Sequence, residues 1–295
     1  MSPGTYTASY AGMWTWIVAG SGELIYTAAP IRNYLQNNTQ SNATKAQAQR
    51  AQAAWDALSR AITTRLGRAP GPTFTIGEDT FVQLSLQRVY WGKGAPSEIQ
   101  DALWLATLLG VVNEGDLNRY CRESLGVDCG GFVANYWGFG KPTVTDMKPT
   151  GYAGMLPRDF WNDAGNRRRA RPDQIREGDA VIFFEGKVVG NDPSTLAPKL
   201  ADGSYDTSKG TKAFHIGLVD TVSVLGNSVA QLRVAESSGA SSQYGGNGVN
   251  VRDVVIQSTT VAAGLVGCAL SASERIYFVA PRNGRIEPYL SQFGD

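Results

Sequence analysis

The first half of the chain spaces its apolar residues as helices do. From Asn42 to Leu66 they recur every three or four positions, which predicts a helix that packs on a core through one face. A second helix is predicted to start with Ser97 and Gln100 in capping-box spacing and to end at Gly110. A shorter helical piece, Asp116 to Ser124, follows it. These spacings predict a mainly helical first half.

The second half changes to short runs of β-branched and aromatic residues bounded by Gly, Asn, Asp or Ser. Such runs predict strands of an antiparallel sheet, so helices followed by strands indicate an α+β fold. The stretch from 190 to 212 is polar and too long for a simple hairpin, and we expect a lid or an insertion there. The expected strands are Asp179 to Phe184, Phe214 to Asp220, Ala230 to Glu236, Val249 to Val255 and Arg275 to Ala280.

Composition names no partner class by itself. A chain of 295 residues with 42% hydrophobic residues can form a full core, and a net charge of +1 gives no global field that would attract nucleic acid. The apolar stretch from Ala11 to Leu24 is interrupted by polar residues and follows no basic segment, so we expect neither a Sec signal nor a membrane span. We therefore expect a protein made in the cytoplasm that, if it acts outside the cell, is exported by a non-Sec system.

The numbers of cysteine and histidine residues and one run of arginines limit the kinds of site that the chain is expected to form. Three cysteines, Cys121, Cys129 and Cys268, and one histidine favour neither a disulfide framework nor a metal site, so we expect no metal and no cofactor. The run "NRRRARP", from Asn166 to Pro172, is predicted to be a solvated loop, and contact with an anionic wall polymer or an immunity partner is the alternative.

One stretch, "LGVDCGGFVANYWG", places Cys129 at the start of a predicted helix. The unpaired N–H groups of a helix N-terminus stabilise a thiolate. Gly130 and Gly131 are expected to expose the sulfur and to let a substrate carbonyl reach backbone donors. The cysteine end of this helix is therefore expected to face out, although a small buried hydrophobe is the alternative for a free cysteine.

A nucleophilic thiol needs a base, and His215 is the only imidazole in the chain. Gly217 follows it on the same face of a predicted strand and is expected to leave open space beside the ring. Glu236 ends the next predicted strand, where an antiparallel pairing would bring it within hydrogen-bond reach of the ring to orient it. The alternatives for this third position are Ser237, Gln243 and Asn247.

Three motifs in this order resemble the NlpC-type cell-wall cysteine peptidases, members of the papain-like fold, and their CHAP amidase relatives. "LGVDCGGFV" is similar to the nucleophile motif of that family, "PDQIREGDAVIFF" to its Pro-Gly-Asp strand and "FHIGLVD" to its base motif. The resemblance covers about residues 116–280. It implies a papain-like domain over residues 111–295, in which helices pack on a central antiparallel sheet, with residues 1–110 as an N-terminal helical extension of unknown role.

The resemblance also implies residue roles. Cys129 would be the nucleophile, His215 the general base and then acid, and Glu236 the orienting residue. Gly130 stands where the family usually has serine, and a glutamate at the third position is more like the CHAP branch. The residues expected to form the oxyanion site or to contact substrate are Gly130, Tyr120, Gly217 and Ser237.

Together these features predict a thiol hydrolase that cleaves amide bonds in bacterial peptidoglycan peptides. Such a chain would be a delivered antibacterial toxin, with an immunity or delivery protein as partner, or a phage lysin. The alternative that keeps the thiol chemistry is a papain-like acyltransferase or a hydrolase of protein or lipid amides and esters. A non-catalytic binding module is the third hypothesis.

Overall fold

A computed structural model of the chain describes residues 1–29, 31, 34–35, 42–138, 156–186, 193, 195–201, 204–239, 248–282, 286 and 288. Contacts divide the chain into two compact units. The sheet unit comprises Met1–Thr5, Met155–Glu236 and Asn250–Glu287. The helical unit comprises Tyr6–Gly154, Ser237–Val249 and Pro288–Asp295.

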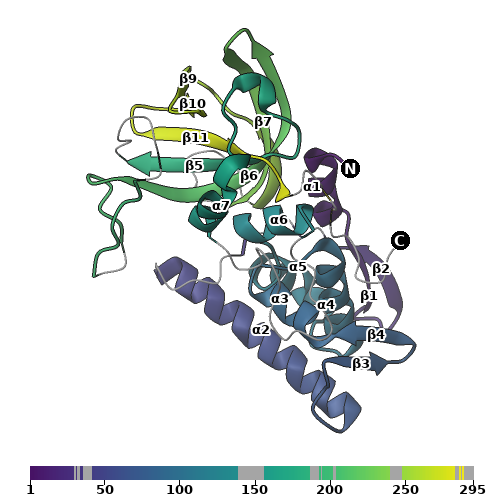
Figure 1. Ribbon diagram of the computed structural model, residues 1–295. Coiled ribbons are helices and arrows are strands. Elements are labelled where there is room, and N and C mark those ends of the chain that lie inside the picture. The colour runs from purple at the N-terminus through teal and green to yellow at the C-terminus, as the bar shows by residue number, and fades with distance from the viewer. Residues whose placement is uncertain are drawn as a thin grey trace. The chain divides into compact units, whose positions relative to one another are not determined.

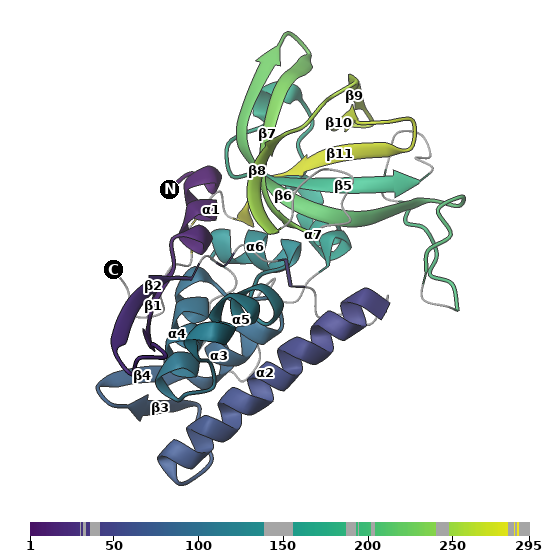
Figure 2. The ribbon, with the colours of Figure 1, turned by 180° about the vertical axis from the view of Figure 1, so that it is seen from behind.

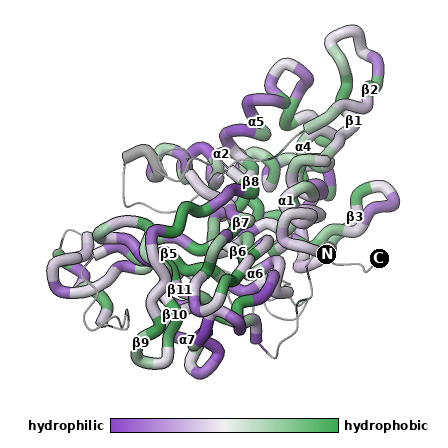
Figure 3. The backbone as a smooth tube through the Cα atoms, turned by 90° about the horizontal axis from the view of Figure 1, so that it is seen from above, coloured by the Kyte–Doolittle hydropathy of each residue, from purple (hydrophilic) through white to green (hydrophobic). Residues whose placement is uncertain are grey.

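The sheet unit is built on a seven-stranded sheet in the order β8-β7-β6-β5-β11-β10-β9 (Figures 1 and 2; β8 is labelled in Figure 2). The recorded pairs from β7 to β9 are all antiparallel, which agrees with the predicted α+β class. The first five residues of β5 are apolar and buried on both faces, as expected for a strand at the centre of a sheet (Figure 3). The strands are β5 (Ala180–Gly186), β6 (Thr211–Leu225), β7 (Ser228–Ser238), β8 (Gly248–Asp253), β9 (Ser258–Ala262), β10 (Leu265–Ala269) and β11 (Glu274–Val279).

Each face of this sheet is covered by apolar side chains. On one face, Phe183 of β5, Val219 of β6 and Val234 of β7 belong to a continuous buried hydrophobic cluster. On the other face, helix α7 (Pro157–Ala164) packs against β5 and β6, and its Trp161 ring lies 5.2 Å from the Phe184 ring. Two short 3-10 turns, η2 (Gly165–Arg167) and η3 (Pro172–Gln174), follow the helix.

The first three arginines of the run after α7 are half-buried and held by groups of the sheet unit, so the prediction of a solvated loop is wrong for them. Their partners are carboxylates, backbone carbonyls and one indole ring of the same unit. Only the last of the four arginines pairs at the surface. The contacts are Arg167 with Asp163, Arg168 with the ring of Trp161, Arg169 with Asp179 and Arg171 with Asp173.

The expected insertion at 190–212 lies partly outside the described residues. In its described part, Leu196 forms an isolated parallel bridge with Thr211 at the start of β6. The Thr211 N–H donates to the Thr195 carbonyl at 2.9 Å, and the Thr211 hydroxyl donates to the Pro193 carbonyl at 2.8 Å. This part of the segment therefore folds back onto the first residues of β6.

The helical unit combines helices with two small hairpins. Helix α2 packs against α3 and α5, and Figure 2 shows it running along that group of helices. Because α2 and α5 lie before and after residue 110, this packing differs from the expected domain boundary there. The elements are α1 (Pro3–Ala11), β1 (Trp14–Val18), β2 (Leu24–Ala28), α2 (Asn42–Leu66), β3 (Thr73–Ile76), β4 (Asp79–Val82), α3 (Gln83–Tyr90), α4 (Pro96–Leu108), η1 (Glu114–Asp116), α5 (Leu117–Glu123) and α6 (Cys129–Tyr136).

Helix α4 is present as predicted, but its cap is not the expected one. The Glu98 carboxylate accepts the N–H of Ala95 at 2.8 Å, which satisfies one donor of the first turn. The Gln100 amide instead donates to the carbonyl of Trp14 in β1 at 2.5 Å. The predicted Ser97 and Gln100 capping box is therefore wrong, because Gln100 joins the helix to the neighbouring hairpin. Over the described residues, no helix combines the length and apolar character needed to cross a membrane.

A buried ion pair joins three helices of this unit. Arg88 of α3 and Glu98 of α4 are both 0% exposed, and their charged groups lie 3.0 Å apart. The same guanidinium donates to the Asn135 side chain of α6 at 3.0 Å and to the Lys93 carbonyl at 2.8 Å. One guanidinium therefore fixes α3, α4 and α6 to one another.

Replacing Arg88 with Met is expected to lower the free energy of unfolding by about 3 to 5 kcal/mol, because the buried Glu98 carboxylate loses its charged partner. Urea denaturation followed by circular dichroism measures this change. Arg50 is the matched control, since its side chain is 51% exposed and lies 3.9 Å from Glu123. Arg50→Met is expected to cost less than about 1 kcal/mol. Equal losses for the two variants would contradict the assignment.

Candidate functional site

Helix α6 begins at Cys129, as the sequence predicts, and its first turn is firmly held. The Asp128 carboxylate accepts the N–H of Gly131 at 2.6 Å, which is the N-cap hydrogen bond. The Lys93 ammonium pairs with the other oxygen of that carboxylate. The Asp128 N–H in turn donates to the Gly92 carbonyl at 2.7 Å. Asp128, the residue before Cys129, is therefore held through both its side chain and its backbone.

Tyr34 contacts the Cys129 thiol, and no motif in the sequence marked it. Its hydroxyl is hydrogen-bonded to the cysteine side chain. Burial raises the pKa of the Tyr34 hydroxyl well above its usual range, and the neighbouring Cys129 and Asp128 raise it further. Tyr34 thus keeps its proton and can donate it in a hydrogen bond. Cys129 is 7% exposed, so the expectation that the thiol faces outward is wrong.

A glycine brings the Tyr34 segment to this position. Gly92 has a φ of +71°, and a Cβ atom there would lie 1.9 Å from the carbonyl oxygen of Leu35. Only glycine therefore lets Leu35 approach the loop that carries Lys93. The Gln47 side chain of α2 donates to the Tyr34 carbonyl at 2.7 Å and holds the segment from the other side. This close approach joins residues far apart in the sequence, which explains why periodicity could not reveal it.

Three other predicted residues lie in the helical unit. The Tyr120 hydroxyl is hydrogen-bonded to the Tyr90 hydroxyl at 2.6 Å. The tyrosine that is hydrogen-bonded to the Cys129 thiol is Tyr34. The Ser237 hydroxyl donates to the Val127 carbonyl at 2.5 Å, which supports the chain two residues before Cys129. Gly130 is buried in the first turn of α6.

The sheet unit holds the predicted base and its orienting residue. The His215 Nε2 atom of β6 lies 3.0 Å from the Glu236 Oε2 atom of β7. This is the contact that strand alternation predicts. Arg252 of β8 donates to both oxygens of the same carboxylate, from Nε at 2.7 Å and from Nη2 at 3.0 Å. Sequence reasoning missed Arg252, although it falls within one of the predicted strands.

The charge state of Glu236 follows from these two neighbours. Burial raises the pKa of this carboxyl, but the charges and hydrogen bonds of His215 and Arg252 outweigh burial and lower the pKa to about 2. When the ring is neutral, an anionic carboxylate at Nε2 favours the tautomer that carries its proton there. In that tautomer Nδ1 bears the lone pair, which is the chemical form of a general base.

Gly217 has a different role from the one expected. The register pairs Leu218 with Ala235, which puts Glu236 opposite Gly217. A Cβ atom at Gly217 would lie 2.6 Å from Val234 Cγ1 and 3.2 Å from Glu236 Cβ. The expected open space is therefore already filled by β7, and glycine is needed so that the Glu236 side chain can lie against β6.

The predicted residues thus form two groups in two units. Cys129 and Tyr34 belong to the helical unit, and His215 and Glu236 belong to the sheet unit. Gln243 and Asn247, the alternatives for the third position, lie outside the described residues. Within the described ranges, no cluster of three or more His, Cys, Asp or Glu side chains could hold a metal ion.

Comparison of the chain with protein-family models, with curated proteins and with solved structures finds no match.

Protonating Glu236 is expected to destabilise the fold. Its folded pKa of about 2 lies below the ordinary value of about 4.3, so its stabilisation is present above that ordinary value and is lost as the pH falls towards 2. The loss amounts to roughly 3 kcal/mol. Urea denaturation between pH 6 and pH 2 should show a steeper loss for the wild type than for Glu236→Gln.

A matched control for this experiment is Glu185→Gln. Glu185 pairs with Lys212 at 2.8 Å where both side chains are about one third exposed. This variant is expected to keep the pH dependence of the wild type. Coinciding profiles for the wild type and Glu236→Gln would refute the assignment.

Proposed function

We propose that the chain is a cysteine amide hydrolase of the papain-like type that cleaves peptide bonds in bacterial peptidoglycan. The observation that carries the proposal is the His215 ring hydrogen-bonded to a buried, anionic Glu236 that Arg252 holds from the other side. A carboxylate in this position orients an imidazole and stabilises its protonated form during proton transfer. A capped helix start with Cys129 in its first turn supports the nucleophile assignment.

The proposal requires the thiol and the imidazole to meet in the working enzyme. His215 takes the proton of the Cys129 thiol, and the sulfur attacks the amide carbonyl carbon. Backbone N–H groups near Cys129 and the Tyr34 hydroxyl stabilise the negative charge on the carbonyl oxygen. Protonated His215 then gives its proton to the leaving amine, which leaves a thioester. Water that loses a proton to His215 hydrolyses the thioester and releases the carboxylate and the thiol.

Peptidoglycan as the substrate rests on the three motifs that resemble the NlpC-type and CHAP enzymes. In chain order a helix start with the cysteine precedes a strand with the histidine, which supports a papain-like arrangement. A chain with this activity is suited to the role of a delivered antibacterial toxin, opposed by an immunity protein, or of a phage lysin.

Replacing Cys129 with Ala is expected to abolish the release of peptide fragments from purified peptidoglycan, a loss of at least about a thousandfold, because no other group takes the place of the sulfur. Mass spectrometry of the soluble products measures the loss and identifies the new chain ends. Cys268→Ala is the control, since Cys268 lies in the core of the sheet unit. Undiminished release by Cys129→Ala would refute the proposal, and an adduct with an added amine would indicate acyl transfer instead.

Removing the Tyr34 hydroxyl is expected to lower kcat by about 10- to 100-fold with little change in KM, because a donor to the developing oxyanion is lost. Tyr34→Phe removes only that group. Tyr120→Phe is the matched comparison, since the Tyr120 hydroxyl contacts Tyr90, and it is expected to keep the wild-type kcat. The reverse result would assign the oxyanion role to Tyr120, as the sequence predicts.

A further inference from the structure

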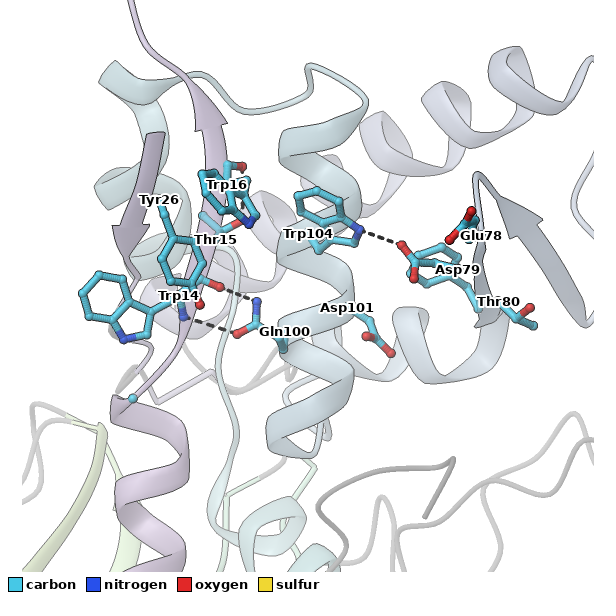
Figure 4. A pocket seen from close by; sticks show the side chains of 12 residues that line it. Trp14, Thr15, Trp16, Tyr26, Glu78, Asp79, Thr80, Gln100, Asp101 and Trp104 are labelled. Carbon is cyan, nitrogen blue, oxygen red and sulfur yellow. Dashed lines mark hydrogen bonds between the residues drawn. The ribbon is translucent and has the colours of Figure 1, made fainter. Parts of the chain in front are cut away.

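A pocket of about 880 Å³ lies in the helical unit, among residues that the proposed chemistry does not use. Its lining comes from the β1–β2 hairpin, from α4 and from the start of β4. Figure 4 shows the aromatic side chains of the hairpin on one side of α4 and Glu78 and Asp79 on the other. This volume falls within the range of about 300 to 1,000 Å³ that is typical of ligand sites.

One wall of the pocket is aromatic and exposed. Trp14, Trp16 and Tyr26 are between 43% and 54% exposed. Thr15 and Ile17, which alternate with the two tryptophans along β1, are buried. The Tyr26 ring centroid lies 5.3 Å from that of Trp14 in a stacked arrangement and 4.9 Å from that of Trp16. The hairpin therefore holds three large rings together at the surface. A contiguous exposed aromatic patch of this kind marks an interaction site.

The opposite wall is acidic. Glu78, Asp79 and Asp101 line the pocket, and its lining contains no lysine, arginine or histidine. The Asp79 carboxylate is held by the indole N–H of Trp104 at 3.2 Å. Burial, together with the charges of Glu98 and Asp79, raises the pKa of Asp101 to about 7. Since Asp101 is therefore only partly ionised near neutral pH, Glu78 and Asp79 carry most of the negative charge of this wall, and no cationic side chain lines the pocket.

We propose that this pocket binds the cationic side chains of a basic peptide segment. Aromatic faces attract guanidinium and ammonium groups through their ring quadrupoles, and carboxylates on the opposite wall add direct charge complementarity. An anionic ligand is disfavoured by the same carboxylates. A neutral glycan would stack on the rings but gains nothing from the excess negative charge. This inference is independent of the proposed thiol chemistry, because it concerns other residues of the chain.

The test titrates the full chain with a short acetylated and amidated peptide in which two arginines alternate with glycine. Tryptophan fluorescence reports binding, and the matched probe has citrulline in place of each arginine, which keeps the shape and removes the charge. Only the arginine peptide is expected to bind. Trp16→Ala and Glu78→Gln are each expected to weaken its binding about threefold.

Two controls localise the effect. Leu24→Ala changes an exposed side chain on the ring-bearing face of the same hairpin, beyond Tyr26 and outside the pocket lining, and Asp56→Asn removes an exposed carboxylate on α2. Both are expected to bind as the wild type does. Glu78 is exposed, so its variant keeps the test valid if Trp16→Ala fails to fold. Equal binding of the citrulline peptide, preferential binding of a neutral chitotetraose, or no binding of the arginine peptide below about 10 mM would each overturn the proposal.

Discussion

The buried ion pair between Arg88 and Glu98 is the interaction on which the helical unit depends. Burying a charge costs several kcal/mol unless it is fully paired, and here Glu98, Asn135 and the Lys93 carbonyl supply the partners. The Arg88 guanidinium holds the backbone of Lys93, and the Lys93 ammonium pairs with Asp128, the N-cap of α6. Arg88 therefore also supports the helix start that carries Cys129. Packing and candidate chemistry are therefore linked through one side chain.

The sheet unit uses a buried charge in a different way. Glu236 lies between His215 and Arg252, and its two cationic or donating neighbours keep it ionised in a fully buried position. A carboxylate held this way cannot turn away from the imidazole without breaking its hydrogen bonds to Arg252. The geometry thus favours a single ring orientation and a single tautomer, which is the preparation that proton transfer needs.

The sequence was most informative where a pattern is local. Helical spacing located α2 and the start of α6, and strand alternation correctly placed Glu236 beside His215. Contacts between distant segments left no periodic trace, so Tyr34 at the thiol and Arg252 at the carboxylate were missed. The arginine run was misjudged for the same reason, because the carboxylates and the indole that hold it are set by tertiary packing rather than by neighbouring residues.

Gly217 shows what a missing side chain can contribute. Its α-carbon faces Val234 and Glu236 so closely that even a methyl group would collide with them. Selection for the close packing of β6 on β7 beside the histidine–carboxylate contact would therefore favour glycine at this position. A glycine two residues after the histidine is consequently a trait by which diverged descendants of this chain could be recognised, even where the surrounding strand residues have been exchanged.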